Sequence, residues 1–170
     1  SLTPLQSWKT GDRLLTRERE RGLDDAYLTA ELLRGELPPA SLGRQHLDDL
    51  TDRATELAQI AETYCSGRPA HTQEVCVDVG GTRIIGRVRH VYGHRIVRVS
   101  YSNLAAKHRF RAWLDLLTLA LHDPTQVWEA IVIGRDGKKT KETHLRAPAR
   151  AQAQTYLAEL LDIYTRGMCE

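Results

Sequence analysis

Basic side chains are concentrated in the middle of this chain, where no carboxylate accompanies them. Between Asp78 and Asp115 there is no aspartate or glutamate, but there are eight basic residues: Arg83, Arg87, Arg89, Arg95, Arg98, Lys107, Arg109 and Arg111. The rest of the chain contains the other 16 basic residues and all 22 acidic ones, which gives it a net charge of −6. The net charge of the whole chain is +2. Because phosphates attract clustered cations over long distances, this distribution predicts contact with nucleic acid. A solvated, arginine-rich sheet face is the alternative.

The other chemistry-bearing residues form no recognisable catalytic or metal-binding motif. His90 and His94 are four residues apart, but they flank an expected turn and have no acidic residue nearby in sequence. Cys65, Cys76 and Cys169 are odd in number and contain no CxxC pair, which predicts neither a disulfide framework nor a thiolate zinc site and indicates a reducing cytoplasm. The patterns GxSxG, GxGxxG and GxxxxGK[ST] are also missing. We therefore expect no bound metal and no cofactor.

The composition is typical of one folded domain without a membrane segment. The chain has 170 residues, of which 41% are apolar and 27% charged. Its apolar runs, such as residues 119–121, are far shorter than the roughly 20 residues of a membrane helix. The first residues lack the pattern of a secretion signal, and a chain that begins with Ser1 and ends at Glu170 is interpreted as a piece of a longer protein. We expect a cytoplasmic location and no membrane partner.

Two regions precede the first expected strand. Residues 1–43 hold short apolar clusters interrupted by glycine and proline, which predicts a partly helical arm without one long helix. From His46 onward one face stays apolar at helical spacing, through Leu47, Leu50, Leu57 and Tyr64. We therefore expect an N-terminal arm over residues 1–43 and a main domain over residues 44–170.

A three-stranded meander is predicted next, and it carries most of the central arginines. Alternating valines over residues 75–79 lead through a glycine pair at 80–81 into a strand over 82–91, and a second turn at 92–94 leads into a strand over 95–101. Alternation places Ile84 and Val88 on one face of the second strand and Arg83, Arg87 and Arg89 on the other. The predicted sheet therefore has a basic side.

The last third of the chain predicts helix, strand, weak strand and helix. Apolar residues recur at helical spacing over 105–122, a buried strand is expected over 127–134, and a weaker strand over 140–145. Pro148 fits the first turn of a final helix. We expect these helices to bury the stripes Phe110, Trp113, Leu114, Leu117 and Leu121, and Tyr156, Leu157, Leu160, Leu161 and Tyr164. Burial is also the expectation for Trp8 and Trp128.

The resulting order is an α+β fold of the α/β-sandwich type, with helices covering a sheet. Helix, three-strand meander, helix and strand is also the core order of the PD-(D/E)XK nucleases, in which carboxylates on the second and third strands hold magnesium at the scissile phosphate. Aligning residues 86–91 with the G-x-(I/V)-D pattern of that family puts Arg89 at the place of the first acid. The next strand offers Val99 and Tyr101, or Arg98 and Ser100 in the other register. We expect a nuclease-like core, order αβββαβ plus a C-terminal helix, that has lost its activity.

Several blocks resemble one family. RAWLDLLTLAL at 111–121, IVIGRDGK at 131–138 and AQAQTYLAELLDIYTRGM at 151–168 are similar to the C-terminal domain of the exodeoxyribonuclease V gamma subunits (RecC), with weaker similarity at 32–43. The resemblance implies a non-catalytic domain within an ATP-dependent helicase/exonuclease complex that processes double-strand DNA ends in recombinational repair. It also implies the beta and alpha subunits of that complex as partners, and double-strand ends and single-stranded tails as the DNA. Recognition of Chi is not carried over.

The residues suggest how such a domain handles DNA. Arg83, Arg87, Arg89 and Arg98 are candidates for a phosphate-binding groove, and Tyr92, at an expected turn, for stacking on a base or simply for filling the turn. Two other functions stay open. One is a protein-docking module without DNA contact, whose arginines pair with acidic partner surfaces. The other is an active metal-dependent nuclease whose ligands come from elsewhere, with Glu62, Glu74 and Asp78 as candidates.

Overall fold

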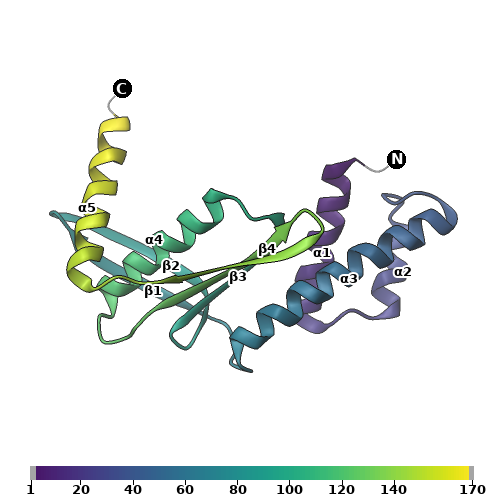
Figure 1. Ribbon diagram of the computed structural model, residues 1–170, viewed down its shortest axis with the longest axis horizontal. Helices are drawn as coiled ribbons and strands as arrows, with labels where there is room; N and C mark the ends of the chain where they lie inside the picture. Colours follow the sequence, from purple (N-terminus) through teal and green to yellow (C-terminus); the bar gives the residue numbers. More distant parts are fainter. Residues whose placement is uncertain (1–2, 169–170) are drawn as a thin grey trace. The chain divides into compact units, whose positions relative to one another are not determined.

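The computed structural model describes residues 3–168, which form a mixed α+β fold as expected. Its elements are α1 (Pro4–Arg21), α2 (Asp25–Leu33), α3 (Ala40–Cys65), β1 (His71–Val79), β2 (Thr82–Tyr92), β3 (Arg95–Asn103), α4 (Ala106–His122), β4 (Glu129–Asp136), β5 (Lys139–Arg146) and α5 (Arg150–Gly167) (Figure 1). No helix in this described part is long and apolar enough to cross a membrane.

The chain divides into two compact units. One comprises Ser1–Thr63, Val99–Leu104 and Ile133–Lys141, and the other Tyr64–Arg98, Ala105–Val132 and Glu142–Glu170. The boundary expected between residues 43 and 44 falls inside α3. Residues before it hold α1, α2 and the first turn of α3, so the arm is more helical than the glycines and prolines predicted.

Local side-chain contacts determine where the first helices begin and end. The Thr3 hydroxyl accepts a hydrogen bond from the backbone N–H of Gln6, and the Gln6 amide oxygen accepts one from the backbone N–H of Thr3, which is a capping box at the start of α1. Gly22, at φ 77°, follows the last residue of α1, and Asp24 caps α2. These signals explain why α1 runs for 18 residues without a break.

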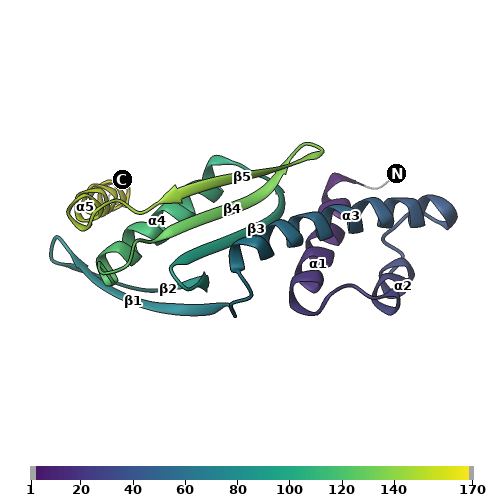
Figure 2. The ribbon, with the colours of Figure 1, turned by 60° about the horizontal axis from the view of Figure 1, so that its bottom comes forward.

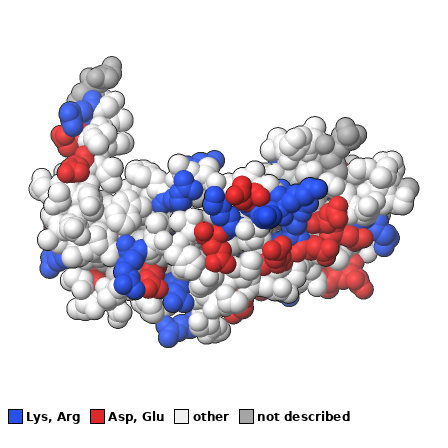
Figure 3. Space-filling view, in the orientation of Figure 1, with Lys and Arg blue, Asp and Glu red and all other residues white. Residues whose placement is uncertain are grey.

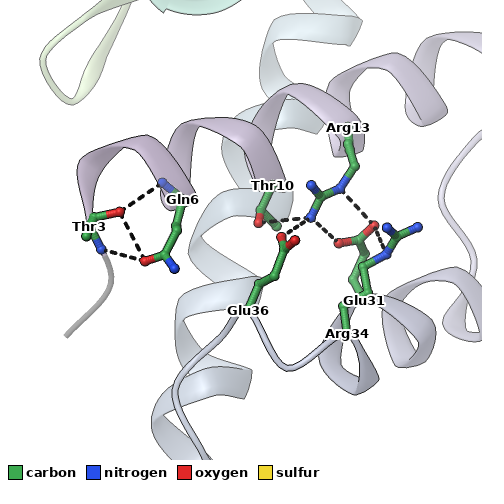
Figure 4. A network of polar contacts seen from close by, with 7 residues as sticks. All are labelled: Thr3, Gln6, Thr10, Arg13, Glu31, Arg34 and Glu36. Carbon is green, nitrogen blue, oxygen red and sulfur yellow. Dashed lines mark hydrogen bonds and ion pairs between the residues drawn. The ribbon is translucent and has the colours of Figure 1, made fainter.

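An ionic network joins α1 to α2 (Figure 4). The Glu31 carboxylate is 1% exposed and lies 2.9 Å from Arg13 Nη2 and 3.1 Å from Arg34 Nε. The same Arg13 nitrogen lies 2.7 Å from Glu36 Oε2. A buried carboxylate needs such partners, because its isolated charge would be strongly destabilising. The network therefore explains how Glu31 is accommodated in the interior.

The five strands form one sheet in the order β1-β2-β3-β4-β5. β1 and β2 are antiparallel and are joined by Gly80 and Gly81, at φ 55° and 82°, which is the backbone that a tight two-residue hairpin requires. β2 and β3 are also antiparallel. The start of β4 bonds to His94, just before β3, and its end bonds to Leu104, just after β3, so β3 and β4 run in parallel. The predicted meander is thus present.

A bulge interrupts β2. His71 is paired with Val91 whereas Gln73 is paired with Val88, so β2 has one residue more than β1 over this stretch. His90 takes φ 60°, a conformation that residues with a side chain seldom adopt. The alternation of buried and exposed residues along β2 is interrupted at this bulge, and the next two residues, Val91 and Tyr92, are both buried.

The core of the second unit lies between the β1–β2 hairpin and two helices. Val77 and Val79 of β1 pack with Leu117 and Leu121 of α4 and with Leu157 of α5. Trp113 lies at the border of this cluster and is partly buried, and Trp128 is 4% exposed. The positions of Trp113 and Trp128 agree with the predicted core. The expectation of burial was wrong for Trp8 of α1, which is 37% exposed.

The apolar stripes of the last two helices were predicted wrongly in part. In α5 only Leu157 of the predicted stripe is fully buried, whereas Tyr156 and Tyr164 are 40% and 64% exposed. Phe110, at the start of α4, is 50% exposed. α5 contacts α4 and β1 through its first half, and its second half extends beyond them (Figures 1 and 2). The spacing of apolar residues predicted the helix α5 correctly, but it did not predict how much of α5 is covered by α4 and β1.

Candidate nucleic-acid interface

One face of the β1–β2 hairpin is open to solvent. Arg83, Ile85, Arg87 and Arg89 are exposed on β2, whereas Ile84 and Val88 point to the other face and are partly or fully buried. On the neighbouring strand Glu74, Cys76 and Asp78 are exposed. We call this set, Glu74, Cys76, Asp78, Arg83, Ile85, Arg87 and Arg89, the open hairpin face. The predicted alternation of the arginines along β2 is confirmed.

Two of these arginines have acidic partners directly across the hairpin. Asp78 is paired in register with Arg83, and the Asp78 Oδ1 to Arg83 Nε distance is 3.1 Å. Glu74 is paired with Arg87, at 3.4 Å between Oε1 and Nε. The carboxylate of Asp78 raises the pKa of Arg83, so this guanidinium keeps its charge. All four side chains are more than 60% exposed, and exposed pairs of this kind are weak and easily exchanged for another anion.

Arg89 differs from the other two. It lies at the bulge of β2 and is exposed, and within residues 3–168 it has no ion-pair partner. A guanidinium that is charged, solvated and unpaired can accept a phosphate without breaking an existing contact. Arg89 is therefore the side chain of this face best placed to bind an anion.

Arg98 is held away from the open hairpin face. Its guanidinium is ion-paired with Asp115 of α4, and the two side chains are only 21% and 18% exposed. Burial raises the pKa of Asp115 and lowers that of Arg98, which the attraction between the two charges opposes. Both groups thus need each other to remain ionised, and Arg98 is not free to bind a phosphate in this conformation.

Tyr92 and the two β3 residues that the sequence aligned with nuclease ligands lie in different surroundings. Tyr92 ends β2 and is 8% exposed, so its ring offers little surface to a base. On β3, Val99 is half-buried and Tyr101 is fully buried. Burial raises the pKa of the Tyr101 hydroxyl, although the nearby cation Arg135 opposes the shift.

The acidic residues considered for a metal site are placed differently. Glu74 and Asp78 are engaged by Arg87 and Arg83, and Glu62 is an exposed residue of α3. Over residues 3–168 the structure contains no cluster of three or more histidine, cysteine, aspartate or glutamate side chains that is arranged to hold a metal ion.

Sequence reasoning missed the cross-strand acids as part of this surface. A signal for them exists, because a two-residue turn at Gly80–Gly81 fixes which residues of β1 and β2 face each other. It also missed Ile85, which is 75% exposed between the two ion pairs. Figure 3 shows acidic and basic side chains interspersed on the face that it displays.

The profile of one protein family, the RecC C-terminal domain, matches residues 1–170. The chain belongs to this family. The RecC C-terminal domain described here is 37% identical over 169 residues to the protein named RecBCD enzyme subunit RecC in Mycobacterium tuberculosis, and 36% identical over 170 residues to the protein of the same name in Mycolicibacterium smegmatis.

Both matches cover 98% of this chain and 15% of the relative, so the chain spans about one seventh of the length of these relatives. Among solved structures, the crystal structure of SSO0001 aligns with 89% of this chain and 82% of its own, at 11% identity and a TM-score of 0.38. That similarity is too low to support a conclusion about the fold.

Proposed function

We propose that this RecC C-terminal domain is a non-catalytic DNA-handling and scaffold domain of a RecBCD-type helicase/nuclease complex that acts on double-strand DNA ends in recombinational repair. Its partners are then the beta and alpha subunits of that complex, and its place is the cytoplasm. The observation that carries the DNA contact is the row of exposed arginines on β2, in which Arg89 has no ion-pair partner within the described residues.

A nuclease-like core without nuclease activity is the second part of the proposal. The order α3, β1, β2, β3, α4, β4, followed by β5 and α5, supports it. At the places where the PD-(D/E)XK family has its metal ligands and its lysine, this chain has Arg89 on β2, followed on β3 by Val99 and Tyr101, or by Arg98 and Ser100 in the other register. Magnesium prefers oxygen ligands and carboxylates in particular, and none of these side chains is a carboxylate. The fold type is kept while the chemistry is lost.

The arginine row binds DNA through its phosphates. Phosphate contacts release condensed counterions and carry no base specificity, which suits a domain that meets DNA ends of any sequence. Arg89 binds first because it has no competing partner, and Arg83 and Arg87 join by leaving Asp78 and Glu74. The two carboxylates therefore limit the affinity of the surface.

Charge variants of the open hairpin face test this proposal. In fluorescence anisotropy with tailed DNA, we expect Arg87→Ala/Arg89→Ala to weaken binding and to reduce the salt slope by about 1.4, or roughly 0.7 per lost phosphate. Glu74→Gln/Asp78→Asn should strengthen binding several-fold. Arg150→Ala, an exposed arginine of α5, is the matched control. DNA binding that ignores all four substitutions would contradict the proposal.

Protein docking is a second candidate, and one observation favours it. Ile163 and Tyr164, in the second half of α5, are 59% and 64% exposed, and Met168 just beyond is 70% exposed. Apolar side chains gathered on one exposed helix end are typical of a contact with another protein. Ile163→Ala/Tyr164→Ala should then reduce co-purification of the chain with the beta subunit, whereas unchanged co-purification would count against docking through α5.

A further inference from the structure

Helix α1 covers Tyr101 of β3. In one of the two registers considered for the PD-(D/E)XK pattern, Val99 takes the place of the second carboxylate and Tyr101 that of the lysine. We call Tyr101 the vacated β3 position. Tyr101 is 0% exposed. A Cβ atom added to Gly11 of α1 would lie 2.1 Å from Cε1 and 2.3 Å from Cζ of the Tyr101 ring. The backbone of α1 therefore lies directly on this ring, and only glycine permits the approach.

A second contact continues along the same side of α1. The indole N–H of Trp8 donates a hydrogen bond of 2.8 Å to the hydroxyl of Ser102. Trp8 precedes Gly11 by three residues, so both lie on one side of the helix. α1 thus contacts two consecutive residues of β3, Tyr101 and Ser102.

The Tyr101 ring is enclosed from another direction as well. The Arg135 guanidinium of β4 lies 5.0 Å from the ring centroid. The Tyr101 hydroxyl oxygen is buried, and the cations Arg135 and Arg53 oppose the rise of its pKa that burial causes.

α1 is also secured at other points. The capping box of Thr3 and Gln6 closes its start, and Arg13 binds the buried carboxylate of Glu31 in α2 (Figure 4). Leu14 and Leu15 are buried at 0% and 3% exposure. The contacts of Arg13, Leu14 and Leu15 follow Gly11 directly, so they hold this part of α1 within its unit.

We propose that α1 is a permanent plug over the vacated β3 position, which excludes DNA and divalent cations from it. The inference rests on the nuclease-like core proposed above. It means that DNA contact is confined to other surfaces, of which the open hairpin face is the candidate.

Tyrosine nitration read out by peptide mass spectrometry tests the plug in the chain as it is. We expect tetranitromethane to modify Tyr101 on the order of a hundredfold more slowly than Tyr164, because reaction requires a local opening of α1. Adding tailed DNA should leave this ratio unchanged. Faster nitration of Tyr101, or faster hydrogen exchange across α1, when DNA is bound would show that α1 lifts to admit DNA and would overturn the proposal.

A glycine pair gives the matched variants. Gly11→Ala forces α1 away from the ring and should raise Tyr101 nitration at least tenfold, on the order of the shift expected for a local opening. Gly167→Ala, also at a helical glycine but with nothing within 4 Å of the added Cβ, should leave nitration unchanged. Equal nitration in both variants would overturn the plug. If Gly11→Ala does not fold, the nitration rates of Tyr101 and Tyr164 in the unmodified chain still test the plug. This comparison of rates does not depend on whether the chain binds DNA.

Discussion

Single arginines have three different surroundings in this chain. Arg83 and Arg87 face acids across a solvated hairpin, Arg98 is enclosed with Asp115, and Arg89 at the bulge has no ion-pair partner within residues 3–168. Only exposed guanidinium groups exchange partners easily, because a buried pair that is broken leaves a charge without solvent. The count of basic residues therefore overstates the number that are free for DNA.

A polar cluster at the end of α3 carries a pH-dependent prediction. The Tyr64 hydroxyl donates a hydrogen bond of 2.7 Å to Glu142, whose carboxylate also lies 3.1 Å from His144 Nε2. The bond from Tyr64 is the main cause that lowers the pKa of Glu142 below its ordinary 4.5. A carboxyl whose pKa is lowered by folding stabilises the protein above pH 4.5, and this contribution is lost as the pH falls through the lowered value.

Tyr64→Phe removes that hydrogen bond. We expect the melting temperature of the variant to fall less steeply than that of the parent chain between about pH 5 and pH 3, because Glu142 then titrates closer to its unfolded value. Circular dichroism melts over this range give the comparison. Tyr164→Phe, which alters an exposed ring of α5, serves as the control. Identical acid-side slopes for Tyr64→Phe and the parent would refute the assignment.

At the scale of elements, periodicity located every helix and strand from residue 44 onward. The Gly80–Gly81 turn, the alternation of β2 and the helix over 106–122 all follow from local residue preferences. The arm was underestimated, because the capping of α1 by Thr3 and Gln6 and the ion pairs of Glu31 depend on side chains that a search for glycine and proline ignores. The bulge at His90 has no signal in the sequence that we recognise.

The two halves of α5 differ in how strongly they stabilise the fold. Leu157 is 5% exposed within the core of the second unit, so Leu157→Ala should lower the free energy of unfolding by about 2–5 kcal/mol. Ile163→Ala/Tyr164→Ala changes exposed residues and should stay within about 1 kcal/mol for the pair, about 0.5 kcal/mol for each residue. Urea unfolding measures both. A large loss for the double variant would mean that the second half of α5 is packed in solution.

At the scale of the whole molecule, sequence similarity identified the family and charge distribution suggested the ligand, but neither places the ligand on a surface. The Asp115 partner of Arg98 lies 17 residues further along, on a helix, and the cover over Tyr101 comes from residues near the start of the chain. Such long-range contacts depend on how the elements pack, which local spacing does not encode. The sequence therefore predicted the exposure of the β2 arginines correctly, but it did not predict the surroundings of Arg98 and Tyr101.

The salt dependence of DNA binding tests the central claim most directly. Three arginines of the open hairpin face that contact three phosphates of a single-stranded tail give a slope of log K against log salt near about −2. We predict such a slope for the parent chain and a slope near zero for Arg83→Ala/Arg87→Ala/Arg89→Ala, with no cleavage of the DNA in magnesium. A triple variant with the slope of the parent, or cleavage by the parent chain, would contradict a non-catalytic DNA contact through β2.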